Sequence, residues 1–319
     1  MATSDKISVA MTTYNGEKYL REQLDSLYSQ TRIPDEIIVT DDLSSDNTVK
    51  ILEEYKKNKG LKYFINEKRL GVNKNFEKSI GLCSGNYISF CDQDDIWLPE
   101  KIEKSYLKLK EIEKNGIPSL IKANHVEINA NKEIIRCKKT KDSSLLTDMV
   151  FDFFQSGCTI MINRKMLDYI LPFPETSVIY FDVYTYYTSL IVGNYYRISE
   201  PLMYYRRHSS NITGKYKKDS ISKKIFKIFI KWDRTKYYPL FYVRIARRME
   251  YTSEVQDKYF VKGRKEFYTK VYKIGKEKNI IKKLLMLNGL KELNAFRKIN
   301  AAINIILNEI FPIYGERVN

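Results

Sequence analysis

The feature that most constrains this chain is an apolar segment that ends abruptly in a cluster of carboxylates. Tyr87–Cys91 has the composition of a buried strand, and Asp92, Asp94 and Asp95 follow it at once. Carboxylates that lie side by side repel one another and are costly to remove from water. A divalent cation such as Mg²⁺ or Mn²⁺ removes that cost and leaves coordination positions open for phosphates. The pattern therefore predicts a metal–diphosphate site at the carboxyl end of a strand, where open α/β sheets bind their ligands.

The first hundred residues alternate between two kinds of pattern. Short apolar runs are each followed, after a turn or a capping residue, by a longer run with apolar residues at helical spacing. Such alternation is typical of βαβ units, whose strands are parallel and whose crossovers are right-handed. The strands are expected at 7–12, 36–40, 62–65 and 87–91, and the helices at 19–28, 48–59, 71–82 and 99–115.

Between residues 119 and 214 the pattern is mixed. A loop enters a strand over 155–162, a short helix follows over 164–170, and a tyrosine-rich helix is expected over 182–192. Two short strands, 195–198 and 203–206, are expected to form a pair.

The net charge of +16 is confined to the last third of the chain. Residues 1–214 contain 29 Lys or Arg and 29 Asp or Glu, whereas residues 215–319 contain 26 and 10. This asymmetry predicts a boundary near residue 214 and an anionic partner for the second part. Over 221–232, apolar and basic residues interleave at helical spacing, which is typical of a helix on an anionic membrane. The alternative is a helix packed on the first part, with its basic face in water.

The location of the protein is predicted from what the sequence does not contain. The first six residues lead into a strand without the pattern of a signal peptide, and no apolar run approaches the ~20 residues that span a bilayer. We therefore expect a cytoplasmic protein, associated only peripherally with the inner face of the cell membrane.

The motifs at the ends of the predicted strands resemble, in order and spacing, family 2 glycosyltransferases of the GT-A type. The resemblance spans residues 6–214 and is strongest to the bacterial rhamnosyltransferase branch. It implies an α/β fold, a GT-A (Rossmann-like) mixed sheet flanked by helices. The Lys- and Tyr-rich pattern beyond residue 214 adds a mainly α-helical C-terminal region. The catalytic domain would be residues 1–214, and 215–319 a basic helical region. The matching segments are 9–15 (VAMTTYN), 40–48 (TDDLSSDNT), 71–76 (GVNKNF), 92–97 (DQDDIW) and 204–208 (YYRRH).

The resemblance implies nucleotide-binding roles for residues that follow the first strands. Thr12 and Tyr14 would flank the base, with Tyr14 stacking on it. Asp41 would accept a hydrogen bond from the base; its alternative role is to cap a helix or a turn. Lys74 or Asn75 would contact the nucleotide or its phosphates, or else lie at an exposed helix start.

For the acidic cluster the resemblance implies a metal site that binds Mn²⁺ or Mg²⁺. Asp92 would contact the ribose or support the metal shell, and Asp94 would ligate the cation that bridges both phosphates. His208 would approach the diphosphate or the metal, unless it only ends a strand. A helix cap is the other reading of Asp94, although one cap does not need three carboxylates.

Asp182 occupies the place where this family carries its catalytic base. It lies in an aromatic and apolar run, where a lone carboxylate is unexpected unless it caps a helix or does chemistry. Phe181 and Val183 depart from the family pattern, which commonly has His and Trp beside the base.

Together these features predict an inverting, metal-dependent glycosyltransferase of the hexosyltransferase type. Its donor would be a nucleoside-diphosphate sugar, dTDP-rhamnose or a UDP-hexose, and its acceptor a glycan or lipid-linked saccharide in bacterial surface polysaccharide synthesis. One alternative is a sugar-nucleotide pyrophosphorylase, although a Gly-rich triphosphate loop is not found near the start of the sequence. Another is a non-enzymatic basic protein that binds membranes or nucleic acid, although an acidic crevice repels nucleic acid.

Overall fold

The computed structural model describes residues 5–113, 116–137, 142, 156–173, 180–209, 211, 273 and 280–288. By its internal contacts the chain divides into two units, Met1–Tyr216 and Lys217–Asn319. In the second unit the only helix among the described residues is α11 (Ile280–Asn288). The basic segment 221–232 lies outside the described residues, so its membrane role stays a prediction. Within the described part of the chain, no helix is long and apolar enough to cross a membrane.

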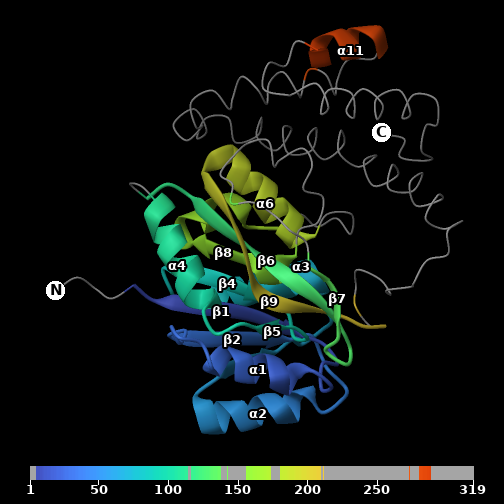
Figure 1. Cartoon of the computed structure of the whole chain (residues 1–319). Helices are drawn as coiled ribbons and strands as arrows, with labels where there is room; N and C mark the ends of the chain where they lie inside the picture. The colour runs from blue at the N-terminus through green and yellow to red at the C-terminus, as the bar shows by residue number, and fades with distance from the viewer. Residues whose placement is uncertain are drawn as a thin grey trace, which may run out of the picture. The chain divides into compact units, whose positions relative to one another are not determined.

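The first unit is built on one nine-stranded sheet flanked by helices (Figure 1). The strands are β1 (Ile7–Thr13), β2 (Glu36–Asp41), β3 (Lys62–Ile65), β4 (Tyr87–Cys91), β5 (Ile96–Trp97), β6 (Ser119–Asn129), β7 (Ile134–Cys137), β8 (Ile160–Asn163) and β9 (Asn194–Arg207). The helices are α1 (Leu20–Tyr28), α2 (Thr48–Lys59), α3 (Val72–Leu82), α4 (Lys101–Ile112), α5 (Leu167–Ile170) and α6 (Phe181–Val192), with short 3₁₀ turns η2 (Gly157–Thr159) and η3 (Arg164–Met166).

The strand directions confirm the expected mixed α/β sheet. The order is β3-β2-β1-β4-β8-β6-β9-β5, with β7 paired to β6. The first four strands are parallel, as the βαβ alternation predicts. Beyond β4, strand β8 is antiparallel to both of its neighbours. The carboxyl ends of β1, β2 and β4 therefore meet at one edge of the sheet.

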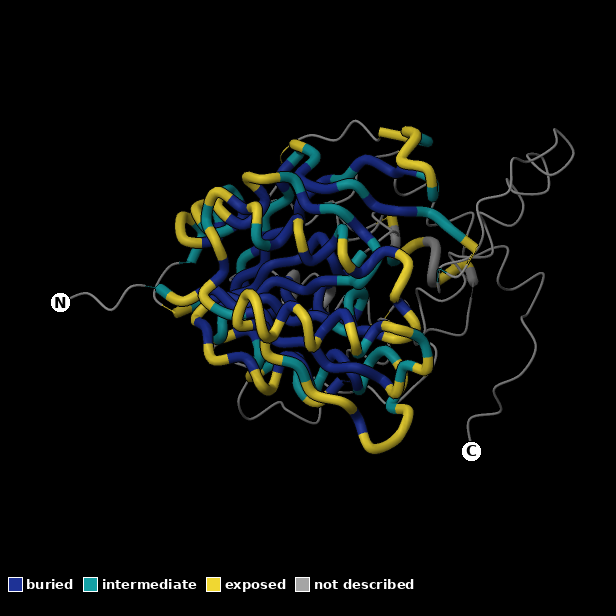
Figure 2. The backbone as a smooth tube through the Cα atoms, turned by 90° about the horizontal axis from the view of Figure 1, so that it is seen from below, coloured by how far each residue is buried: buried dark blue, intermediate teal, exposed yellow. Residues whose placement is uncertain are grey.

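Side chains of β1 alternate between two cores because successive residues of a strand face opposite sides of the sheet. Ile7, Val9 and Met11 are fully buried and pack in one cluster with α1, α2 and α4. On the other face lies α3, whose Ser79 Oγ donates to the backbone carbonyls of Met11 and Ile38. Figure 2 shows the buried strands inside and exposed segments around them. Buried on both faces, the sheet is a rigid support for the loops at its edge.

The expected pair of strands at 195–198 and 203–206 is wrong, because both belong to the single strand β9. Pro201 lies between the two expected strands, and β9 accommodates it opposite Asn124, where the β6–β9 register shifts on both sides. A proline at such an irregularity removes no regular ladder hydrogen bond. The second half of β9 also pairs with β5, through Tyr204 with Ile96 and Met203 with Trp97. Strand β9 thereby brings its last residues to the acidic loop between β4 and β5.

The loop before α3 is held by a buried carboxylate. Asp42 follows β2, is 3% exposed, and accepts hydrogen bonds from the backbone N–H groups of Leu70 (2.7 Å) and Gly71 (3.0 Å). Asn66 Nδ2 donates to the same carboxylate at 2.9 Å. Burial alone would raise the pKa of Asp42, but these donors outweigh it and hold the pKa below its usual value.

We expect Asp42→Ala to lower the free energy of unfolding by about 3 kcal/mol, because two backbone donors lose their acceptor. Urea unfolding measures the loss, with Glu67→Ala on the exposed surface of the same loop as the control. Since the folded pKa lies below the unfolded one, the contribution of Asp42 should be complete above about pH 5 and vanish as the pH falls through the folded pKa. An Asp42→Ala protein as stable as Glu67→Ala would contradict this account.

Candidate active site

The turn after β1 is tied to the turn after β2 by a buried carboxylate. Asp41 is fully buried and accepts hydrogen bonds from Thr13 Oγ1 (2.7 Å), Ser44 N (2.8 Å) and Ser44 Oγ (2.6 Å). Thr12, half-buried, precedes Thr13 at the end of the strand. Both oxygens of the predicted base-binding Asp41 therefore organise these turns from within the protein.

Tyr14 lies at the surface of this edge and is bound to the acidic loop. Its backbone N–H donates to Gln93 Oε1 (2.9 Å), and Gln93 Nε2 donates to its carbonyl (3.0 Å). Its ring is 39% exposed and carries the Arg69 guanidinium 3.4 Å from its centroid. Gly16 allows this close approach, because a Cβ there would lie 2.2 Å from Gln93 Oε1. An exposed aromatic ring and a cation therefore lie at the surface beside the acidic loop.

Of the two predicted residues on α3, one is buried and one lies nearer the surface. Asn75 is 3% exposed; its Nδ2 donates to the Thr40 carbonyl (3.0 Å) and its Oδ1 accepts from Asn66 (2.9 Å). Lys74 makes an ion pair with Glu77 at 3.1 Å. The Asn75 amide therefore joins α3 to β2, and Lys74 is the one of the two that lies near solvent.

The structure brings Asp94 and His208 together across 114 positions of sequence. His208 Nε2 lies 2.9 Å from Asp94 Oδ2, and Asn211 Nδ2 donates to the same oxygen at 3.4 Å. Two adjacent ligands of an octahedral Mg²⁺, each about 2.1 Å from the ion, are about 3 Å apart. Carboxylate and imidazole are also a donor pair that Mn²⁺ accepts. At 2.9 Å the two side chains are in hydrogen-bond contact, and the fold thus brings together two groups of the kinds that ligate such a cation.

Arg206, near the end of β9, holds the acidic loop between β4 and β5 from the protein interior. It is 1% exposed; its backbone N–H donates to Asp95 Oδ1 (3.0 Å) and its Nε to the Asp94 carbonyl (2.9 Å). Its guanidinium also makes an ion pair with Glu22 of α1 and lies 4.6 Å from the Tyr19 ring centroid. Arg206 thus anchors the backbone at Asp94 and one carboxylate oxygen of Asp95, while its own charge is paired with Glu22.

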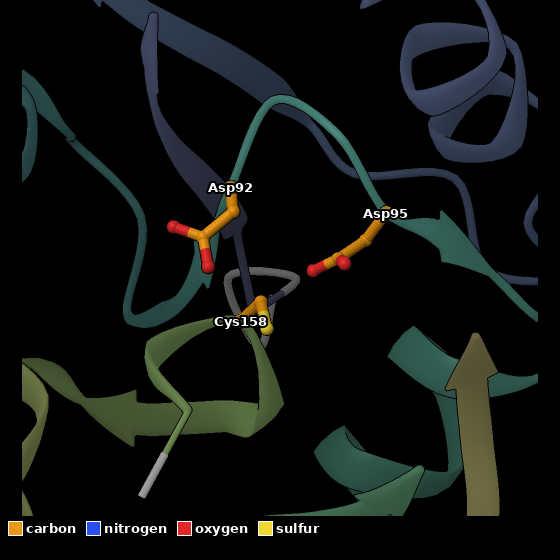
Figure 3. Close-up of side chains that lie close together, drawn as sticks. All are labelled: Asp92, Asp95 and Cys158. Atoms are coloured by element: carbon orange, nitrogen blue, oxygen red, sulfur yellow. The ribbon is translucent and has the colours of Figure 1, made fainter. Parts of the chain in front are cut away.

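Asp92 and Asp95 converge with Cys158 of η2, as Figure 3 shows. One ligand atom from each lies within 4.8 Å of the other two. Burial, together with the charges of Asp94 and Asp182, raises the pKa of Asp92 to about 7. Burial followed by the neighbouring carboxylates also raises the pKa of the Cys158 thiol. The negatively charged forms of these three side chains are therefore destabilised by burial and by one another, and a bound proton or cation would stabilise the cluster.

Asp182 is held at the first turn of α6. Its Oδ1 accepts from the backbone N–H of Val183 (2.7 Å). Burial raises its pKa to about 6, against the opposing effect of the N–H groups of Val183 and Gly157. The preceding Phe181 stacks on Phe76 of α3 with ring centroids 3.9 Å apart. A carboxylate that is partly desolvated, firmly held and ionised at neutral pH has the properties of a general base.

The comparisons with known proteins decide the family. Residues 8–171 match the profile of the family described as Glycosyl transferase family 2. The chain belongs to this family. The GT-A resemblance of the sequence is thereby confirmed, as is the expectation of an enzyme.

Two relatives of this glycosyltransferase are named for sugar transfer. The dTDP-rhamnosyl transferase RfbG of Shigella flexneri is 32% identical over 227 residues, which cover 64% of this chain and 73% of RfbG. The UDP-Glc:α-D-GlcNAc-diphosphoundecaprenol β-1,3-glucosyltransferase WfgD of Escherichia coli is 30% identical over 167 residues, or 51% of this chain and 62% of WfgD. Both names place the relatives in sugar transfer, and that of WfgD includes a lipid-linked acceptor.

Solved structures support the fold of this glycosyltransferase. The Staphylococcus aureus TarS fragment 1–349 with UDP-GlcNAc aligns with a TM-score of 0.55 at 22% identity, covering 66% of this chain and 62% of that one. The same fragment with UDP aligns with a TM-score of 0.53 at 23% identity. The chain thus spans less than two thirds of these fragments, and the likeness concerns the fold alone.

Sequence reasoning did not assign Arg206 or Gln93 a role in this site, and it expected Cys158 only in a segment that lines the acceptor site, not beside the acidic cluster. No local pattern marks them, because each contacts residues more than 60 positions away in the chain. The one available signal was the position of Arg206 and Gln93 inside motifs that the resemblance already quoted.

We expect Gly157→Ala to destabilise this glycosyltransferase by about 1–3 kcal/mol, because the new Cβ would lie 2.4 Å from Phe181 Cζ in a packed aromatic cluster. Gly81→Ala on α3 is the matched control: nothing lies within 4 Å of its Cβ, and alanine favours a helix by about 0.5–1 kcal/mol. Thermal unfolding compares the two. Equal midpoints would mean that the start of α6, which carries Asp182, is not held by this contact.

Proposed function

We propose that this glycosyltransferase moves a sugar, with inversion, from a nucleoside diphosphate to a glycan or lipid-linked acceptor in surface polysaccharide synthesis. The observation that carries the proposal is the Asp94–His208 pair, 2.9 Å apart at the carboxyl end of β4, with Asp92 close enough to both Asp94 and Asp182 for their charges to raise its pKa. A leaving-group site and a base would thus lie near one another. Mg²⁺ or Mn²⁺ bound by Asp94 and His208 would neutralise the charge of the departing diphosphate.

The nucleotide binds, in this proposal, over the turns that follow β1 and β2. The exposed face of Tyr14 offers stacking, and Arg69 and Lys74 offer positive charge near the surface. Thr12 and Asp92 line the approach to the ribose. Asp41 and Asn75 are buried with internal partners, so we infer that they act by fixing the shape of these turns.

Asp182 takes the proton of the attacking hydroxyl in the proposed reaction. The acceptor oxygen forms a bond to the anomeric carbon while the bond to the diphosphate oxygen breaks on the opposite face, which inverts the configuration. With a pKa of about 6, the carboxylate is ionised at pH 7 and yet basic enough to assist. Lys122 lies close enough to favour the ionised form.

Among donors, we infer a dTDP-linked deoxyhexose before a UDP-hexose. RfbG, named for dTDP-rhamnose, is 32% identical over a longer stretch than WfgD, which is named for UDP-Glc. The family membership disfavours both the pyrophosphorylase and the nucleic-acid-binding alternatives.

We expect Asp182→Asn to slow transfer roughly 10²–10⁴-fold while nucleotide binding is retained, because the amide cannot accept the proton. Release of dTDP from dTDP-rhamnose, or of UDP from UDP-hexoses, with lipid-linked acceptors present measures transfer. Asp168→Asn, on the exposed surface of α5, is the matched control and should retain the wild-type rate. In the wild type the rate should fall about tenfold for each pH unit below 6, as Asp182 becomes protonated. A wild-type rate in Asp182→Asn would remove its assignment as the base.

The basic segment 221–232 is proposed to hold the enzyme at the cytoplasmic face of an anionic membrane. The support is the charge asymmetry of the sequence. Exchanging Lys223, Lys224 and Lys227 for Glu should abolish co-sedimentation with anionic vesicles, since each basic residue contributes about 1 kcal/mol at such a surface. Neutral vesicles are the control. Unchanged binding to anionic vesicles would assign the segment to packing or to self-association.

A further inference from the structure

A second group of metal-binding side chains lies beside the Asp94–His208 pair. It comprises one carboxylate oxygen each of Asp92 and Asp95 and the Sγ of Cys158, all within 4.8 Å of one another. The two carboxylates come from the loop between β4 and β5, and the thiol from η2 on the opposite side (Figure 3). His208 and Asp94 are not members of this group.

One atom of this group has no hydrogen-bond donor from outside the group. Asp95 is fully buried; its Oδ1 accepts from Arg206 N, whereas its Oδ2 meets no donor in hydrogen-bond geometry within the described residues. Burial and the charges of Asp94 and Asp92 raise the pKa of Asp95, and the neighbouring Cys158 thiol opposes that rise. Figure 3 shows the Asp95 carboxylate directed toward the space between Asp92 and Cys158. A buried carboxylate oxygen without a donor is costly, and a bound cation would satisfy it.

We propose that Asp92, Asp95 and Cys158 form a binding site for a thiophilic divalent cation, Zn²⁺ in the first instance. A thiolate with carboxylates is a donor set that suits Zn²⁺, whereas Mg²⁺ takes oxygen ligands and an octahedral shell. In a tetrahedral zinc site the sulfur and oxygen ligands are about 3.6 Å apart. The three ligand atoms, which lie within 4.8 Å of one another, would reach this separation through a rotation of the half-buried Asp92 side chain, and water would fill the fourth position. Binding forms a Zn–S bond and releases the thiol proton to solvent.

The positive charge of Lys101 beside this group explains why cation binding there requires a thiolate as well as carboxylates. Lys101 is 1% exposed, and its ammonium lies 3.5 Å from the Trp97 ring centroid, close enough to Asp95 and Cys158 for each to affect its ionisation. This charge opposes a cation held by carboxylates alone. The strong Zn–thiolate bond overcomes that opposition, and a hard cation without such a bond goes instead to Asp94 and His208.

The site has a consequence that rests on the proposed function. Asp92 would be turned toward the zinc and away from the nucleotide, so occupation should inhibit transfer. Zinc would then act as an inhibitor that excess Mg²⁺ does not displace.

The test measures metal binding alone, without nucleotide or acceptor, so its outcome is independent of whether the protein is a transferase. The parent protein is Cys137→Ser, which lacks the exposed thiol. Cd²⁺ is titrated while the ultraviolet cadmium–thiolate absorption is recorded, and Zn²⁺ affinity is measured by calorimetry in excess Mg²⁺. We expect one ion per chain and the thiolate band.

The variants assign the site. Adding Cys158→Ser should remove the cadmium band and weaken Zn²⁺ about tenfold or more, and Asp95→Asn should weaken Zn²⁺ with the band retained. Cys83→Ser removes another buried thiol, near the amino end of β4, and should change neither. Lys101→Met should tighten Zn²⁺ binding. A band that survives Cys158→Ser, or Zn²⁺ affinity unaffected by both site variants, would overturn the proposal; circular dichroism confirms that each variant is folded.

Discussion

The arrangement of the site depends on one buried arginine at the end of β9. Three carboxylates within four residues repel one another, so the loop that carries them has to be held by the protein around it. Arg206 holds it from inside: its backbone N–H binds Asp95, its Nε binds the Asp94 carbonyl, and its guanidinium is paired with Glu22 of α1. It reaches them only because β9 runs unbroken through Pro201 and pairs with β5. The same strand then places His208 two residues further on, beside the Asp94 carboxylate.

Two further contacts join the acidic loop to the other parts of the crevice. Gln93 holds the backbone of Tyr14, so the turn after β1 and the acidic loop are set relative to one another. Phe181, stacked on Phe76, fixes the first turn of α6 and with it Asp182. In the proposed function each chemical role therefore has its own rigid support: an aromatic face for the nucleotide base, a carboxylate–imidazole pair for the cation, and a held carboxylate for the proton. This division of labour is what a group transfer between two substrates requires.

The sequence predicted those elements whose apolar residues recur at a regular local spacing. The strands and helices up to α4, apart from the two-residue strand β5, follow from it, because each element carries its own apolar repeat and its own turn residues. The division of β9 into two strands, 195–198 and 203–206, was predicted wrongly, because a strand irregularity and a strand end look alike in one sequence. The positions of Asp94 and His208 as neighbours came from the family resemblance. The buried roles of Asp41 and Asn75, and the convergence of Cys158 on the acidic loop, depend on packing between distant segments, which periodicity does not encode.

The central claim is that Asp94 makes nucleotide binding depend on a divalent cation. Calorimetric titration of dTDP, UDP and GDP, each with and without Mn²⁺, into the wild type and Asp94→Ala tests it most directly. We expect one nucleotide to bind the wild type tightly only when Mn²⁺ is present, and Asp94→Ala to lose that dependence together with most of the affinity. Nucleotide binding that is equal with and without Mn²⁺, or unchanged in Asp94→Ala, would contradict the account.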